Sequence, residues 1–145
     1  MSNVFHVRRF AVLVAVITAM LAALVVPASA SATSMSCTNG SPASCLYVHG
    51  ASTWVDFVQG GVALAGFGGN SIRGHNQIYD SHHTFNFNSR TYTFYNPGPA
   101  FKTFWTNRHY MNRRLPNGDV VCSIFWEWKN GHYVKHGPAC ATVRA

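Results

Sequence analysis

Acidic side chains are scarce in this sequence. There are four Asp and Glu residues against eleven Lys and Arg, and the formal net charge is +7 at pH 7. The acids are Asp56, Asp80, Asp119 and Glu127. Because they are scattered along the chain, the paired carboxylates that most glycoside hydrolases use are not predicted. The nucleophile motif G-x-S-x-G is missing too, so we predict a protein without a catalytic centre.

Sustained helical periodicity is missing after residue 32, and the one long apolar run lies before it. Residues 11–26 contain sixteen uncharged residues, which is fewer than the roughly 20 that a spanning helix needs. Arg8 and Arg9 precede the run, and the small residues 27–32 (PASASA) follow it. This order is typical of a secretory signal peptide. We predict a signal over residues 1–30, cleaved after Ala30 or Ala32, and an extracellular product that meets a membrane only before cleavage; a membrane anchor is the alternative.

The four cysteines all follow the predicted signal. An even number in an oxidising compartment predicts two disulfides, and the cysteine spacings do not match those of zinc sites. Three pairings are possible, of which the local one, Cys37–Cys45 with Cys122–Cys140, is the simplest. The ring of residues 37–45 encloses small and polar residues that add little to a core. It is either a rigid docking element or a protection of the new N-terminus, and the sequence does not choose between them.

Residues 31–145 are predicted to form a single β-rich domain. Short segments rich in β-branched and aromatic residues alternate with Gly, Asn and Pro. Such spacing favours an all-β fold, here a small disulfide-stapled antiparallel sandwich or barrel.

Two hairpins can be placed in register. In residues 83–95, a turn at Asn88-Ser89 would put four aromatic residues on one face: Phe85, Phe87, Tyr92 and Phe94. In residues 120–143, Asn130-Gly131 is a strong two-residue turn signal.

The second hairpin also bears on the disulfides. Strict pairing sets Cys122 against Ala139, and one bulge within residues 136–139 would bring Cys122 opposite Cys140. The same register predicts a core face that carries Cys122, Ile124, Trp126 and Trp128. Glu127 would then lie on the opposite face.

Two groups of residues could form a metal site or a catalytic site. Residues 75–83 contain His75, Asp80, His82 and His83, but His82 and His83 would point to opposite faces of a strand, and no metal site or other cofactor is predicted. Small secreted ribonucleases use a Glu, an Arg and a His. Here Glu127, Arg113 or Arg114, and His109 or His132 are the candidates for that alternative function.

Binding is therefore the predicted activity. Without Arg8 and Arg9, nine basic residues face four acidic ones, a net charge of +5, which suits a negatively charged partner such as an acidic protein or a cell-wall surface. No specific nucleic acid is predicted, because no RNA-binding signature occurs. The predicted partner-binding residues lie in the ring and in a basic loop, residues 108–114: Thr38, Asn39, Gly40, Ser41, Pro42, Arg108, Arg113 and Arg114.

In size, layout and cysteine placement, the chain resembles small secreted β proteins of Gram-positive bacteria that act as inhibitors, toxins or adapter subunits. Residues 36–45 (SCTNGSPASC), ahead of a β-rich body, make it similar to the small adapter subunit of umbrella-shaped antibacterial toxin particles. That resemblance implies a short N-terminal segment that docks into a cleft of a partner protein. A small secreted inhibitor or toxin is the alternative.

Overall fold

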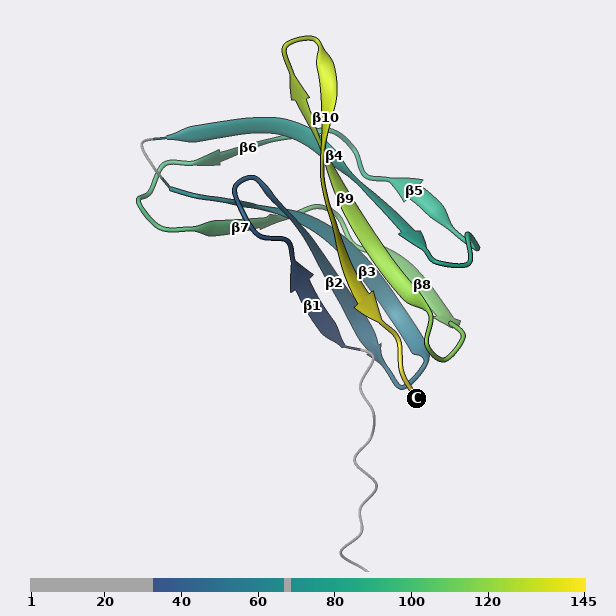
Figure 1. Ribbon diagram of the computed structural model, residues 1–145. Coiled ribbons are helices and arrows are strands. Elements are labelled where there is room, and N and C mark those ends of the chain that lie inside the picture. Colours follow the sequence, from purple (N-terminus) through teal and green to yellow (C-terminus); the bar gives the residue numbers. More distant parts are fainter. Residues whose placement is uncertain (1–32, 67–68) are drawn as a thin grey trace, which may run out of the picture.

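The computed structural model describes residues 33–66 and 69–145; the predicted signal peptide lies outside them. Ten strands and no helix occur in this part of the chain (Figure 1). The strands are β1 (Ser34–Cys37), β2 (Ala43–Ala51), β3 (Trp54–Leu64), β4 (Asn70–Asp80), β5 (Asn86–Asn88), β6 (Tyr92–Asn96), β7 (Lys102–Trp105), β8 (His109–Arg114), β9 (Val120–Lys129) and β10 (His132–Thr142). Over the same residues, no helix is long and apolar enough to cross a membrane.

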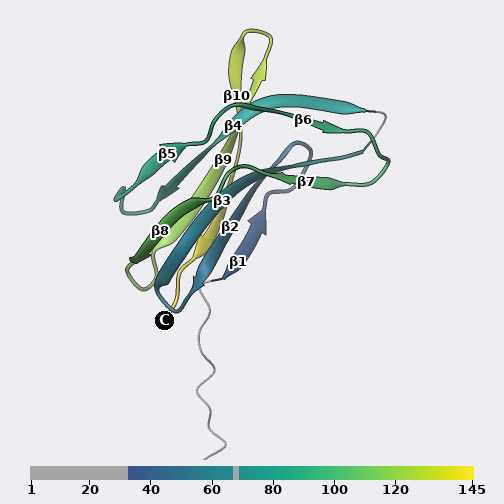
Figure 2. The ribbon, with the colours of Figure 1, turned by 180° about the vertical axis from the view of Figure 1, so that it is seen from behind.

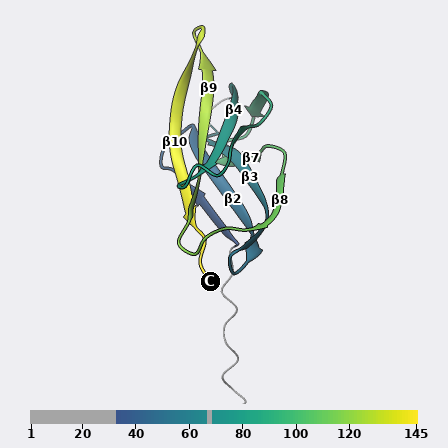
Figure 3. The same ribbon diagram turned by 90° about the vertical axis from the view of Figure 1, so that its right-hand side faces the viewer.

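The strands form two antiparallel sheets. The first sheet has the order β1-β2-β3, and β7 and β8 both pair with β3. The second has the order β10-β9-β4, and β5 and β6 both pair with β4. The side view in Figure 3 shows the two sheets as separate layers. The predicted all-β class with two disulfides is confirmed, and the pairs are Cys37–Cys45 and Cys122–Cys140.

The apolar core lies between the sheets. Its largest cluster takes aliphatic side chains from β2 and β3 on one side and from β4, β9 and β10 on the other. A second cluster around Phe125 joins β3 to β4, β6 and β9. In β2 the buried Leu46 and Val48 alternate with the half-buried Tyr47 and His49, and in β10 the buried Ala139 and Ala141 alternate with more exposed residues, so one face of each strand lies in this core.

A buried polar bridge also joins the sheets. Asn76 of β4 is fully buried, and its Nδ2 donates to the Gly61 carbonyl of β3 (3.1 Å) and to Ser123 Oγ of β9 (3.0 Å). Ser44 Oγ of β2 donates to the Ser123 carbonyl (2.8 Å). Gly60 leaves the space for Asn76, because a Cβ there would lie 2.6 Å from Asn76 Cβ. The bridge thus connects four strands through buried hydrogen bonds.

The hairpin of residues 120–143 has the predicted register. Trp128 pairs with Tyr133 and Cys122 with Cys140, and the register shifts between His136 and Ala139, where the bulge was predicted. The turn residues Asn130 and Gly131 both have positive φ. The end of this hairpin projects beyond both sheets (Figures 1 and 3).

The hairpin predicted over residues 83–95 is wrong. Its two halves, β5 and β6, do not pair with each other but follow one another along the edge of β4. Ser89 continues that edge, since its N–H donates to the Asn76 carbonyl and its Oγ accepts from the Asn76 N–H. The aromatic residues still alternate with exposed polar ones, because period-2 alternation is the same whichever strand is the partner.

The predicted core face of β9 is only half right, because Cys122 and Ile124 are buried but the row that faces the first sheet is the other one. Val121, Ser123 and Phe125 are fully buried between the sheets, and Glu127 lies on their side of the strand. Trp126 points to the other side, where its Nε1 donates to Gln77 Oε1 (2.9 Å). Both rows of β9 carry apolar residues, so alternation alone could not choose the buried face.

We predict that Asn76→Ala lowers the free energy of unfolding by about 2–4 kcal/mol, because it removes two buried hydrogen bonds and leaves a cavity. The matched variant Asn88→Ala, at an exposed position of β5, should change it by less than about 0.5 kcal/mol. Urea denaturation measures both. Equal losses would show that the bridge does not stabilise the fold.

Candidate functional site

The tip of the N-terminal ring is exposed, but its base belongs to the core. Residues 38–42 connect β1 to β2, with Asn39, Gly40 and Ser41 exposed. Ala43 and Cys45 pack with Ala63 in a buried cluster, and the Ala65 N–H donates to Ser41 Oγ (2.8 Å). The expectation that the ring adds little to the core is therefore wrong for residues 43–45, because β2 begins inside the ring.

The predicted basic loop is mostly a strand, β8, so its arginines diverge. Arg108 lies over the Phe57 ring, with its guanidinium carbon 4.6 Å from the centroid. Arg114 donates to Thr53 Oγ1 (3.4 Å). Arg113 turns to the other side of the strand, where it lies 5.3 Å from the Phe85 centroid and donates to Thr84 Oγ1 (3.1 Å). The arginines therefore do not form one patch.

The disulfide ring of residues 37–45 and the strand β8, which carries Arg113 and Arg114, lie at opposite ends of β3. Arg114 pairs with Trp54, the first residue of β3, whereas Ser41 bonds Ala65, just after its last residue. At about 3.3 Å per residue, this separation is about 36 Å. The two predicted surfaces thus do not form a single small footprint.

Aromatic side chains cover the outer surface of the first sheet between these ends. We call this surface the aromatic face; Figure 2 shows the sheet that carries it in front. Its members are Tyr47, His49, Trp54, Asp56, Phe57, Trp105, Arg108 and Tyr110. Of these residues, only Arg108 is among those predicted from the sequence to bind a partner.

Phe57 is the centre of the aromatic face. Its ring stacks on His49 (centroids 4.9 Å apart) and contacts Tyr47 and Tyr110, each at 5.8 Å. Trp105 extends the row at 6.1 Å from Tyr47. Phe57 is only 7% exposed, whereas Tyr110 is 64% exposed. The buried Phe57 side chain thus supports the more exposed aromatic side chains around it.

One carboxylate lies within the aromatic face. Asp56 accepts hydrogen bonds from Trp54 Nε1 (2.8 Å) and His49 Nδ1 (3.1 Å). A register shift between Val55 and Phe57 accompanies this arrangement, and it brings both Asp56 and Phe57 to the outer side. The alternation of Tyr47 and His49 with buried Leu46 and Val48 was a usable sequence signal, but nothing in the sequence located the bulge.

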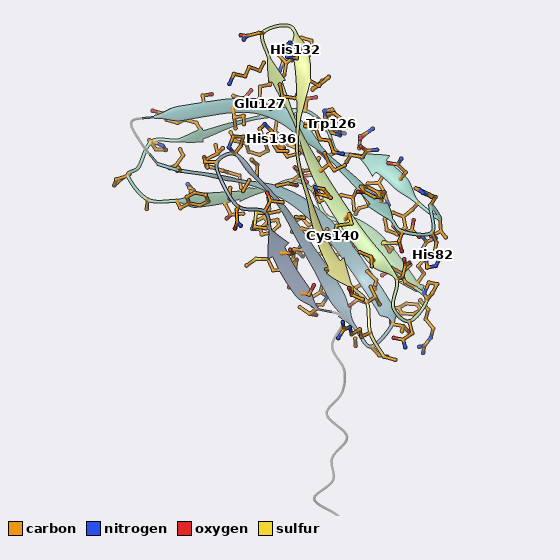
Figure 4. All side chains as sticks on the ribbon, viewed as in Figure 1. His82, Trp126, Glu127, His132, His136 and Cys140 are labelled. Atoms are coloured by element: carbon orange, nitrogen blue, oxygen red, sulfur yellow. A yellow bond between two sulfur atoms is a disulfide. The ribbon has the colours of Figure 1, made fainter. Side chains whose placement is uncertain are left out.

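The ribonuclease-like set does not assemble as predicted. His109 stacks on Phe87 at 3.7 Å, Arg113 lies on Phe85, and His132 is at the projecting hairpin tip (Figure 4). Glu127 instead meets His136, whose Nε2 is 2.8 Å from Glu127 Oε2. Across residues 33–66 and 69–145, Glu127 has no arginine within ion-pair distance.

The Glu127–His136 pair lies beside a cleft. Glu127 lines the cleft together with Ser41, Pro42, Leu64, Ser71 and Ile72. The two side chains are 15% and 22% exposed, so they are shielded but reachable. A carboxylate that bonds a histidine can exchange a proton with a bound group.

The histidine-rich segment is divided by the fold. His75 contacts Tyr133 (4.9 Å), and burial lowers the pKa of its imidazole. Asp80 lies five residues further along β4, about 17 Å away, where His82 and Asp119 join it. Burial acts to raise the pKa of Asp80, but hydrogen bonds from Thr84 and Phe85 outweigh it and hold the pKa below its ordinary value.

Comparison of the sequence and structure with known protein families, curated proteins and solved structures finds no match.

We predict that Phe57→Ala lowers the free energy of unfolding by about 3 kcal/mol, because it empties a nearly buried aromatic site. Tyr110→Ala, on the same face, should lower it by less than about 1 kcal/mol, since most of that side chain is in water. Chemical denaturation of both variants checks the difference. Similar losses would mean that Tyr110 is part of the core packing and not a free surface group.

Proposed function

We propose that this protein is a secreted, non-enzymatic protein-binding module and that the aromatic face is its interface. The observation that supports this most is the Phe57-centred set of rings with Arg108 and Tyr110 at its surface. Trp, Tyr and Arg are the residues enriched at binding hot spots. An aromatic surface on the outside of a sheet is also a recognised mark of an interaction site.

A protein partner with an acidic rim suits this surface better than RNA does. Stacking of bases requires open ring faces, whereas Arg108 lies over the Phe57 ring. Asp56 also places a carboxylate within the face, which would repel phosphates laid across it but not a partner whose acids lie only at the rim. The basic excess of the chain supports attraction to an acidic protein, mainly through the rate of association.

The ring remains a proposed second contact. Thr38, Asn39, Gly40, Ser41 and Pro42 lie about 36 Å from Arg114 along β3, so only an extended partner would reach both. Arg108 belongs to the aromatic face and Arg114 to its edge beside Trp54. Arg113 faces the other way and is left out of the proposed interface.

The two disulfides suit an extracellular or other oxidising environment, which supports the secreted part of the proposal. The layout resemblance to umbrella toxin adapters supplies one specific version of it. In that version the partner is a larger subunit of an extracellular antibacterial assembly, and this chain connects it to another component.

The test is capture of a partner from the culture supernatant of the producing cells, followed by affinity measurement with the purified partner. The double variant Arg108→Ala/Tyr110→Ala should weaken binding by at least about 30-fold, the loss of one hot spot. The matched control Arg90→Ala/Tyr95→Ala removes the same residue types from exposed positions of the β5–β6 connection and of β6 and should bind normally.

Three outcomes would overturn the assignment. Equal weakening by both double variants would mean that general charge and aromaticity bind the partner. If nuclease treatment abolishes capture, the captured partner is RNA and not a protein. If Asn39→Arg, at the exposed ring tip, abolishes capture while Arg108→Ala/Tyr110→Ala does not, the interface is the ring.

The Glu127–His136 contact favours a second candidate function, general acid–base cleavage of RNA. A carboxylate and a histidine 2.8 Å apart at a cleft are the residue types that general acid–base catalysis uses. If this function holds, Glu127→Gln and His136→Asn should each lower RNA cleavage by at least about a hundredfold. Arg113→Ala and His132→Ala, both remote from the pair, should not. A ribonuclease assay that detects no cleavage by the unaltered protein excludes this candidate.

A further inference from the structure

A cluster of two buried carboxylates and a histidine lies at one end of the second sheet. Asp80 ends β4, His82 follows in the connection to β5, and Asp119 immediately precedes β9. One oxygen or nitrogen from each side chain lies within 4.8 Å of the others. In Figure 4, His82 lies far from Glu127 and His136, so this cluster is separate from the cleft described above.

The charge of this cluster is not balanced by the surrounding side chains. Asp80 and Asp119 are both fully buried, and two of the four acids of the chain are thus side by side. Their only ion-pair partner in the described chain is His82, whose Nδ1 is 2.9 Å from Asp119 Oδ1. Buried carboxylates at short range repel each other unless a proton or cation compensates them.

Asp119 has an unused buried oxygen. Its Oδ1 accepts from Ser81 Oγ (2.6 Å), from the Val120 N–H (2.8 Å) and from His82. Its Oδ2 is buried and has no hydrogen-bond partner among the described residues. A buried charged oxygen without a partner is costly, and a bound cation would supply the missing partner.

Asp80 is held in place as metal-binding carboxylates are. Its Oδ2 accepts from Thr84 Oγ1 (2.7 Å) and its Oδ1 from the Phe85 N–H (3.0 Å). These bonds orient the carboxylate and leave lone pairs on both oxygens. Hydrogen bonds of this kind commonly fix the ligands of a metal.

We propose that Asp80, His82 and Asp119 bind a divalent transition-metal ion, with Zn²⁺ as the best match. One imidazole nitrogen and two carboxylate oxygens are a Zn²⁺ donor set, whereas Ca²⁺ takes six to eight oxygens. Tetrahedral bonds of about 2.1 Å place ligand atoms about 3.4 Å apart, so ligand atoms that now lie within 4.8 Å of one another would close by up to about 1.4 Å. The side chain of His82 is 57% exposed and can turn to do so, which leaves the fourth position open to water or to a partner's ligand.

The site would tie the β4–β5 connection to the start of β9. Ser81 and His82 already reach Asp119 across 38 and 37 residues of sequence. A shared ion would strengthen that link and raise the unfolding temperature when the ion is present.

The experiment uses the purified protein with both disulfides intact, stripped with EDTA and dialysed. Calorimetric titration with Zn²⁺ should show one site, and Ca²⁺ and Mg²⁺ should show none. His82→Ala should weaken Zn²⁺ binding by at least about tenfold, and Thr84→Val by about 10–100-fold through loss of ligand orientation. His132→Ala, which removes an exposed histidine at the hairpin tip, is the matched control and should bind Zn²⁺ normally.

Two further measurements keep the test decisive. Asp119→Asn preserves the size of the buried side chain, and circular dichroism shows whether it folds; a folded variant should lose the site. The visible absorption of bound Co²⁺ reports nitrogen and oxygen ligation in the unaltered protein, and it should change in His82→Ala. Equal Zn²⁺ affinity in the unaltered protein and His82→Ala, binding of Ca²⁺ alone, or no stoichiometric Zn²⁺ binding would each overturn the proposal.

Discussion

The hydrogen bonds of Asn76 and Ser44 between the two sheets are the constraint on which the rest of the structure depends. They connect β2, β3, β4 and β9 through groups that have no access to water. Apolar packing between sheets tolerates sliding, whereas a buried amide that loses its partners costs its full desolvation. The bridge therefore sets how the sheets lie on each other, and with it which surfaces remain outside.

The aromatic face follows from that arrangement. With Leu46, Val48 and Val58 directed into the core, Tyr47, His49 and Phe57 must lie on the outer side of the first sheet. Arg108 and Tyr110 then come to Phe57 through the pairing of β8 with β3. The proposed interface is built from four strands, and a preorganised surface of this kind would lose little ordering entropy on binding.

The two ends of the second sheet carry different chemistry. Near the projecting hairpin, Glu127 and His136 form a shielded pair beside the N-terminal ring. At the other end, Asp80 and Asp119 place half of the chain's acids in one buried cluster. Few acids in the sequence do not mean few acidic interactions, because the fold concentrates those that exist.

The sequence by itself determined the all-β class and the hairpin of residues 120–143, and it favoured the local disulfides, since each rests on short-range signals. Asn130-Gly131 defines its turn, and the spacing of Cys122 and Cys140 requires one bulge in their hairpin. Tertiary structure alone decided the rest. Alternation along β5, β6 and β9 showed two faces but not which strand is the partner or which face is buried, because a period of two is the same in either case. The meeting of Phe57 with Tyr110 and of Asp80 with Asp119 depends on strand pairings and sheet packing that no local pattern encodes.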